Sequence, residues 1–109
     1  MRPFTVVLGV AIAVAACSSG LQPPPTSAMI ASMPDTIPCE KAVKVEAGSE
    51  RNGIAAERRW LDGYYPNHGA YGQAVARQNG RTFDILTFRR DNGHEASVCF
   101  DITSFFGRQ

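Results

Sequence analysis

Short runs of alternating apolar and polar residues, separated by turn-forming residues, fill the C-terminal third of the chain. "QAVARQ" (73–78) and "RTFDILTFRR" (81–90) are joined by Asn79-Gly80, a strong signal for a two-residue β-hairpin. A second turn signal at 91–93 precedes "HEASVCFDI" (94–102), whose apolar residues alternate along one face. This period of two is the pattern of a strand with one buried face. The runs therefore predict three antiparallel strands in sequence order.

A helix is predicted ahead of these strands, over Ser49 to Tyr64. Ser49 is a favoured N-cap residue, and Gly63 with Pro66 is typical of a helix end. One helical stripe is expected to face the core: Ile54, Arg58, Leu61 and Tyr65. The predicted fold class is α+β, with one helix packed on a three- to four-stranded antiparallel sheet.

Two shorter segments complete the predicted domain. "AVKVEA" (42–47) alternates and suits a short fourth strand, although a helix over 40–46 fits the same residues. Phe105 and Phe106 follow the last strand. Adjacent aromatic residues in this position are expected to fold back onto the core or to cover a sheet edge, and an exposed partner-binding tip is the alternative.

The first 16 residues have the features of a secretory signal peptide. Met1-Arg2 gives a positive start, and residues 4–16 form an uncharged run that ends in small residues. A membrane-spanning helix needs about 20 apolar residues, so this run is too short to cross a bilayer. The pattern predicts a signal peptide over residues 1–16 that is removed on export.

Val14-Ala15-Ala16-Cys17 resembles the lipobox of bacterial lipoproteins, in which an aliphatic residue and two small residues precede a cysteine. The resemblance implies that Cys17 becomes the first residue of the mature chain. Its thiol would carry a diacylglyceryl group and its amine usually a third acyl chain, and two or more chains anchor a protein stably. Ser18, in place of an aspartate, implies delivery to the outer membrane, facing the periplasm. Val14 departs mildly from the commoner leucine.

Residues 17–38 form the predicted lipidated N-terminus and tether. Five of the seven prolines lie between positions 23 and 38, among serine and threonine. Such a composition buries too little apolar surface to offset the entropy of ordering the chain. We therefore expect a disordered tether, followed by a small α+β domain over residues 39–109.

Cys39 and Cys99 are predicted to form a disulfide. Export places the domain in an oxidising compartment, where paired cysteines are common in small domains. Acylation of Cys17 leaves this as the one pairing available among three cysteines. A catalytic or metal-binding thiol is the alternative, but neither cysteine has the close Cys/His spacing that metal sites use.

The net charge and the absence of known motifs exclude several classes of function. Loss of the signal peptide removes Arg2 and leaves ten Lys/Arg against ten Asp/Glu, so no nucleic-acid partner is expected. The chain has no zinc-binding spacing, phosphate loop or serine-nucleophile motif, and we expect no cofactor and no metal. A catalytic site would have to use His68, His94, Asp84 or Asp101. Asp101 is more simply expected to bond nearby main chain at the strand end.

Five ring-bearing residues gather between positions 60 and 71: Trp60, Tyr64, Tyr65, His68 and Tyr71. Tyrosine and tryptophan are enriched at interaction hot spots, so this cluster is the candidate binding surface. Packing of the helix onto the sheet explains the same spacing and is the favoured alternative.

Together these features predict a membrane-anchored envelope lipoprotein that acts as a binding or accessory module. Its partner would be an envelope protein or the cell wall, and an enzymatic role is the less expected one. One alternative is a periplasmic enzyme acting on cell-wall glycans, which requires Asp84, Asp101 and a histidine in one cleft. Another is an inhibitor or immunity-type lipoprotein that inserts the loop 66–72 into an enzyme.

Overall fold

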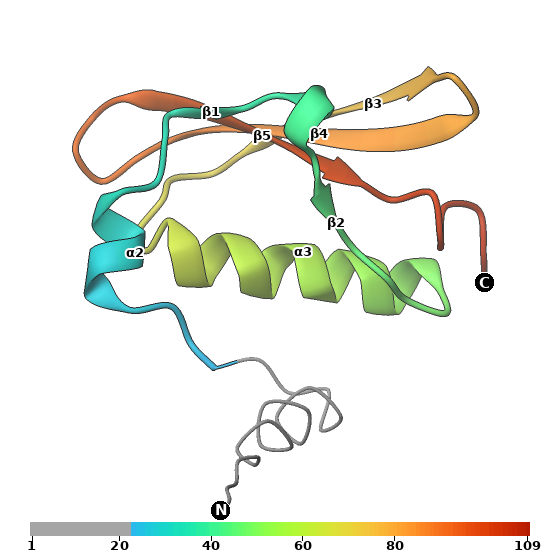
Figure 1. Cartoon of the computed structure of the whole chain (residues 1–109), viewed down its shortest axis with the longest axis horizontal. Helices are drawn as coiled ribbons and strands as arrows, with labels where there is room; N and C mark the ends of the chain where they lie inside the picture. Colours follow the sequence, from blue (N-terminus) through green and yellow to red (C-terminus); the bar gives the residue numbers. More distant parts are fainter. Residues whose placement is uncertain (1–22) are drawn as a thin grey trace, which may run out of the picture.

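The structure, a computed structural model, describes residues 23–109. The predicted signal peptide over 1–16 and the predicted lipid-bearing Cys17 lie outside these residues. In the described part, one long helix packs against one face of a five-stranded sheet (Figure 1). The α+β class expected from the sequence is confirmed.

The long helix α3 (Glu50–Tyr64) has the predicted bounds. The Ser49 hydroxyl oxygen accepts a hydrogen bond from the Asn52 backbone N–H at 3.3 Å. This bond satisfies one of the N–H groups that a helix start leaves without a partner. At the other end, the Tyr65 N–H donates to the Leu61 carbonyl at 2.8 Å.

Leu61 and Tyr65 of the predicted stripe are buried, but in the first half of α3 the buried face is rotated from the predicted one. Gly53, Glu57 and Leu61 are buried, whereas Ile54 of the predicted stripe is 40% exposed. The ring of Phe105 packs so closely on Gly53 that a Cβ there would lie within 2.4 Å of it. A glycine contributes nothing to a hydrophobic pattern, and the pattern therefore pointed to the neighbouring positions.

The predicted meander is present. It consists of β3 (Gly72–Gln78), β4 (Arg81–Arg89) and β5 (Glu95–Asp101), each antiparallel to the next. Asn79 and Gly80, with φ of 53° and 77°, form the turn between the first two strands. Positive φ at both central residues is the requirement of the type I′ hairpin turn that Asn-Gly favours.

Two very short strands make the sheet mixed rather than antiparallel. β1 (Thr36–Ile37) and β2 (Val43–Lys44) both pair in parallel with the outer edge of β5. The 3-10 turn η2 (Cys39–Lys41) separates them. The predicted disulfide between Cys39 and Cys99 is present, and it ties η2 to β5. The strand expected within 42–47 is confirmed as β2.

The expected tether needs correction over residues 26–38, which are ordered. Residues 27–31 form a short helix, α2 (Ser27–Ala31), and β1 extends the sheet. The Arg90 guanidinium holds this segment, since it donates to the Met33 carbonyl at 2.9 Å and to the Asp35 carboxylate at 2.8 Å. The composition indicates that this segment buries too little apolar surface to become ordered. Main-chain pairing with β5 and the hydrogen bonds from Arg90 order it without that burial.

The core lies between α3 and the sheet. Every α3-facing apolar side chain of β4, of β5 and of the residue that follows β5 is buried: Leu86, Phe88, Ala96, Val98, Phe100 and Ile102. Phe105 folds back into this core, as expected, and is 2% exposed. Phe106 does not join it and is 41% exposed.

Candidate functional site

The predicted aromatic cluster lies at the C-terminal end of α3, and some of its rings belong to the hydrophobic core or pack against it. The Trp60 ring lies 4.6 Å from that of Tyr64 and 5.4 Å from that of Phe100 between centroids. Tyr65 is 2% exposed, and its hydroxyl donates to the Pro34 carbonyl at 2.7 Å. Tyr65 is therefore a structural residue and is not available to a partner.

The remaining members of the cluster are half-buried and tied to neighbouring elements. The His68 Nε2 atom lies 2.7 Å from the Asp62 carboxylate, and its ring packs edge-on against Phe88. The Arg58 Nε–H donates to the Tyr71 hydroxyl at 3.1 Å. These contacts hold the loop 66–72 to α3 and the sheet, which is the packing role that the sequence left open.

The residues considered for catalysis do not converge. Asp101 pairs with Phe83 on β4, so both point to one face of the sheet, whereas the adjacent Asp84 points to the α3 side. His94 lies beside the Asp35 carboxylate at 3.1 Å, at the far end of the β4–β5 hairpin. The cleft that a glycan-cleaving enzyme would need is not formed by these residues.

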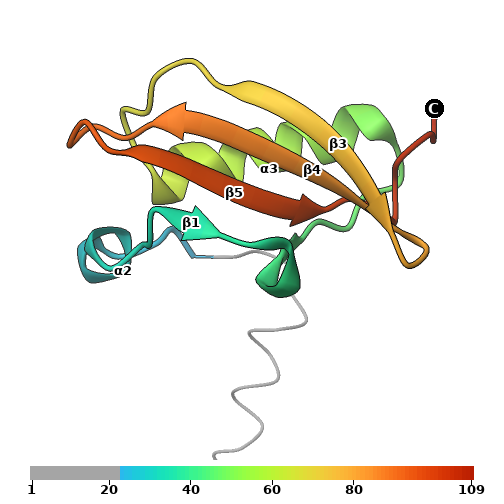
Figure 2. The ribbon, with the colours of Figure 1, turned by 90° about the horizontal axis from the view of Figure 1, so that it is seen from above.

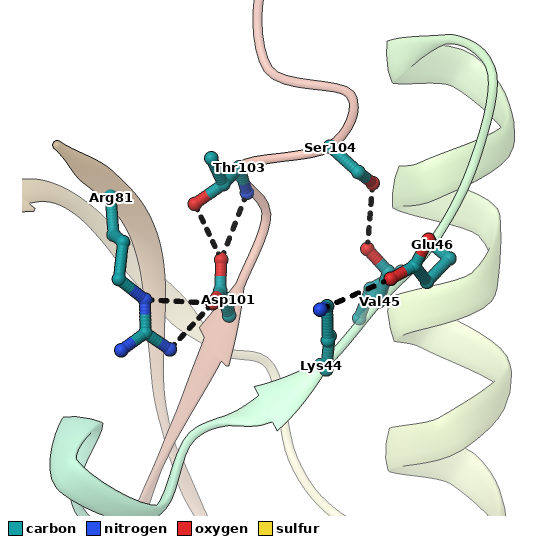
Figure 3. A pocket seen from close by; sticks show the side chains of 7 residues that line it. All are labelled: Lys44, Val45, Glu46, Arg81, Asp101, Thr103 and Ser104. Carbon is teal, nitrogen blue, oxygen red and sulfur yellow. Dashed lines mark hydrogen bonds and ion pairs between the residues drawn. The ribbon is translucent and has the colours of Figure 1, made fainter.

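A surface pocket of about 300 Å³ lies where β2, the end of β5 and the C-terminal segment meet (Figure 3). It is lined by Lys44, Val45, Glu46, Arg81, Asp101, Thr103 and Ser104. We refer to it as the Asp101 pocket. Its size is at the lower end of the range for small-ligand sites. The lining combines two basic and two acidic side chains, which pair with each other: Lys44 with Glu46, and Arg81 with Asp101.

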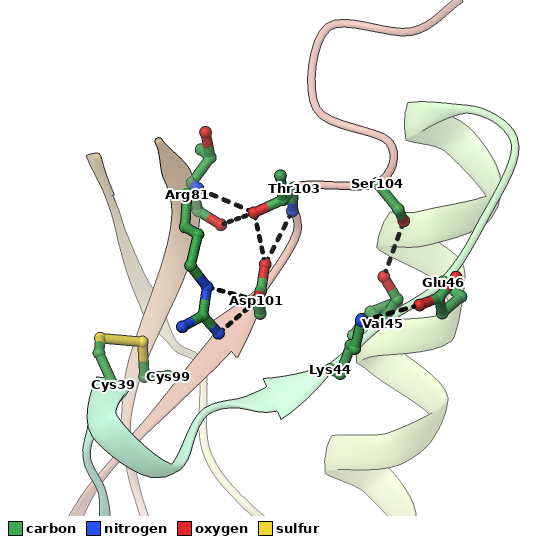
Figure 4. A network of polar contacts seen from close by, with 10 residues as sticks. Cys39, Lys44, Val45, Glu46, Arg81, Cys99, Asp101, Thr103 and Ser104 are labelled. Atoms are coloured by element: carbon green, nitrogen blue, oxygen red, sulfur yellow. Dashed lines mark hydrogen bonds and ion pairs between the residues drawn. A yellow bond between two sulfur atoms is a disulfide. The ribbon is translucent and has the colours of Figure 1, made fainter. Parts of the chain in front are cut away.

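Asp101 is the most connected polar side chain of this pocket (Figure 4). Its Oδ2 accepts from Arg81 Nε at 3.1 Å and Nη2 at 2.7 Å, and its Oδ1 accepts from the Thr103 N–H at 3.0 Å and hydroxyl at 2.6 Å. Burial raises the pKa of Asp101, but the hydrogen bonds from Thr103 and Arg81 outweigh it and the net pKa is lowered. Asp101 therefore stays ionised and positions Arg81. The expected bond from Asp101 to nearby main chain is confirmed.

The rim of the pocket is accessible to a ligand. Lys44 Nζ lies 3.3 Å from the Glu46 carboxylate, and both side chains are 70% exposed. An exposed pair of this kind is held weakly, so either charge is free to turn to a partner. The Arg81 side chain is 55% exposed even while it bonds Asp101. Sequence reasoning singled out Asp101 but not the pocket around it, because only the parallel pairing of β2 with β5 brings the lining residues together.

A buried pair of acids, Glu57 on α3 and Asp84 on β4, is a second feature that the sequence did not indicate. Glu57 is 3% and Asp84 2% exposed. Both Asp84 oxygens accept from the Gln73 amide, at 2.9 and 3.0 Å. Burial, followed by the hydrogen bond to Asp84 and the charge of that residue, raises the pKa of Glu57 to about 9. Glu57 is therefore protonated at neutral pH and joins the helix to the sheet.

Within residues 23–109, no group of three or more His, Cys, Asp or Glu side chains is arranged to hold a metal ion. No helix in that range is both long enough and apolar enough to span a bilayer. The chain matches no known protein family, no curated protein and no solved structure.

Proposed function

We propose that this protein is a lipid-anchored envelope protein whose domain binds a partner through the Asp101 pocket. The observation that carries the proposal is the Cys39–Cys99 disulfide. A disulfide of this kind is typical of exported proteins. It also leaves Cys17, within the lipobox-like Val14-Ala15-Ala16-Cys17, as the one further cysteine of the chain.

The position of the Asp101 pocket supports a role in binding away from the membrane. The first described residues lead into α2, and Ile30 of α2 lies beside Tyr64 at the C-terminal end of α3. The pocket residues Lys44 and Glu46 instead precede the N-terminal end of α3 (Figure 1). A 15-residue helix is about 22 Å long. A lipid attached on the α2 side would thus leave the pocket at the far end of the domain.

Fractionation of the bacterial envelope tests the anchor. Full-length protein and the Cys17→Ala variant are expressed with their N-terminal segments intact. We expect the native protein in the membrane fraction, with the variant soluble or retained as an unprocessed precursor. An equal distribution of the two proteins, both soluble, would refute the lipid anchor.

A charge reversal at the rim tests the pocket. Lys44 is exposed and lies outside the core, so Lys44→Glu is expected to leave the fold intact while it repels a partner that Lys44 attracts. The protein is cross-linked in intact cells and purified, and the envelope partner that comes with it is quantified. For Lys44→Glu this amount should fall roughly tenfold, equivalent to about 1.4 kcal/mol of binding free energy. Lys41→Glu, at an exposed position in η2 outside the pocket, is the matched control. Equal recovery with both variants would exclude the pocket as the binding site.

The loop 66–72 supports an inhibitor or immunity-type role as a second candidate. Asn67, Gly69 and Ala70 are exposed at its tip. The Gly69 N–H donates to the Arg89 carbonyl at 3.0 Å, which fixes the loop against β4. An exposed loop with a fixed shape is what insertion into an enzyme requires. Loss of inhibition on replacement of Asn67 and Ala70 by lysine, with an unchanged melting temperature, would favour this candidate.

A further inference from the structure

Strand β3 forms an open edge of the sheet (Figure 2). It pairs with β4 on one side, and no described residue pairs with its other side. Six of its seven residues are exposed, and Val75 at its centre is 49% exposed. Natural sheets usually protect such an edge with proline, lysine or a bulge. β3 has none of these, and Arg77 is its one charged residue.

The hairpin determines which backbone groups of β3 face outward. Gln78 and Arg81 flank the two-residue turn and exchange hydrogen bonds with each other, as this hairpin type requires. Backbone direction alternates along a strand. The N–H and C=O groups of Gln73, Val75 and Arg77 therefore point away from β4, towards the open edge.

We propose that β3 pairs antiparallel with β3 of a second copy of this chain, about a two-fold axis at Val75. Val75 is the middle residue of Gly72–Gln78, so this register pairs the whole strand. It places Val75 against Val75, and it sets Gln73 opposite Arg77 of the second copy. Both of these pairs use the outward-facing backbone groups. A two-fold contact of this kind is closed, because each copy contributes the same edge.

Side-chain chemistry favours this register over the one centred on Arg77. Like charges directly opposite one another destabilise a strand pair. A pairing centred on Arg77 would bring two arginines together and would use only the end of the strand. A pairing centred on Val75 separates the arginines and buries the exposed apolar side chain at the axis. Ala74 and Ala76 then face each other on the opposite side of the sheet, where their small size allows close approach.

Phe106 extends the proposed contact beyond the backbone. The Arg77 guanidinium lies over the Phe106 ring at 5.9 Å from its centroid. Gln73 of the second copy would sit opposite Arg77, and its side chain would point to the same side of the sheet, beside Phe106. The 41% of Phe106 that is exposed in the single chain would then be partly covered.

Membrane anchoring would strengthen this association, and only this step rests on the proposed function. One strand pair is a small interface, since even a two-stranded hairpin is marginally stable in water. Confinement of lipid-anchored copies to one membrane surface raises their effective concentration without any new contact.

Cysteine cross-linking in the full-length protein tests the register. Cα atoms must lie within about 7 Å to form a disulfide, and a hydrogen-bonded antiparallel pair meets this at about 5.5 Å. Val75→Cys should therefore cross-link to itself on mild oxidation. Gln73→Cys and Arg77→Cys should each fail alone, because identical positions would be roughly 13 Å apart. When they are co-expressed in one cell, these two variants should cross-link to each other.

Thr87→Cys, exposed within the central strand β4, controls for random collision, and the native protein controls for Cys17. The proposal is overturned if Val75→Cys gives no dimer above these controls, if all positions cross-link equally, or if Val75→Cys captures a different protein instead. Adding Val75→Lys to the Gln73→Cys and Arg77→Cys variants should abolish their mutual cross-link, whereas adding Val75→Thr should not; this difference would separate edge pairing from a folding defect. Fractionation of the same samples reports the lipid anchor independently of the cross-links.

Discussion

At the scale of single residues, the buried acids Glu57 and Asp84 are the most unusual feature of the domain. An ionised carboxylate is costly to bury, and two adjacent ones are costlier still. The structure meets this cost with a proton on Glu57 and with the Gln73 amide, which donates to both oxygens of Asp84. The pair is therefore a weak point of the core at high pH.

We predict that Glu57 makes stability fall as the pH rises. The folded protein keeps a proton on Glu57 up to about pH 9, whereas the unfolded chain releases it near the ordinary pKa of 4.5. Between these values the folded state binds more protons, so the free energy of unfolding decreases with pH, by at most about 1.4 kcal/mol per pH unit. Glu57→Gln should flatten this dependence and be the more stable protein at pH 8.

Urea unfolding of full-length protein at pH 5 to 8 measures this effect. Glu40→Gln, at an exposed position in η2, controls for the loss of one acidic residue. Parallel stability profiles for the native protein and Glu57→Gln would contradict the assignment of a buried proton to Glu57.

At the scale of elements, the packing of α3 depends on a residue without a side chain. We predict that Gly53→Ala destabilises the protein, although alanine is the better helix former by about 1 kcal/mol. The new Cβ would lie 2.4 Å from the Phe105 ring, which is itself 2% exposed and has no free space to move into. Overpacking of this kind typically costs about 1–3 kcal/mol, so the clash should outweigh the gain in helix propensity.

The second glycine of the helix provides the control. A Cβ at Gly63 would meet Pro25 at 3.6 Å, which is ordinary van der Waals contact. Gly63→Ala should therefore raise the melting temperature while Gly53→Ala lowers it. Opposite shifts in thermal unfolding would support the close contact between α3 and Phe105, and a rise for both variants would disprove it.

At the scale of the whole molecule, the Cys39–Cys99 disulfide joins residues 60 positions apart. We predict that its removal destabilises the domain by about 4 kcal/mol, since closing a loop of this length restricts the unfolded chain by that amount. The double variant Cys39→Ala/Cys99→Ala should unfold at a lower urea concentration than the oxidised protein. Reductant should shift the native protein to the same midpoint and leave the variant unchanged. A native midpoint that is insensitive to reductant would refute this contribution.

Local signals in the sequence were enough for the elements that depend on neighbouring residues. The turn at Asn79-Gly80 forms because these residues tolerate positive φ, and the capped helix α3 begins where Ser49 supplies an acceptor. The alternation along β5 correctly identified its buried face. These properties are set by side-chain and backbone chemistry within a few residues, which a sequence displays directly.

Tertiary structure alone decided the remaining features. The strand β1 has two residues, too few to show a period, and the alternation over 42–47 that indicated β2 did not indicate its parallel partner; both strands pair with the free edge that β5 offers. That pairing orders part of the expected tether and assembles the Asp101 pocket. The contact between Glu57 and Asp84 likewise depends on the rotation of α3 about its axis. Phe105, which packs on Gly53, fixes that rotation. Contacts between distant residues leave no local pattern, because each partner is chosen by the space and the polar groups that the other provides.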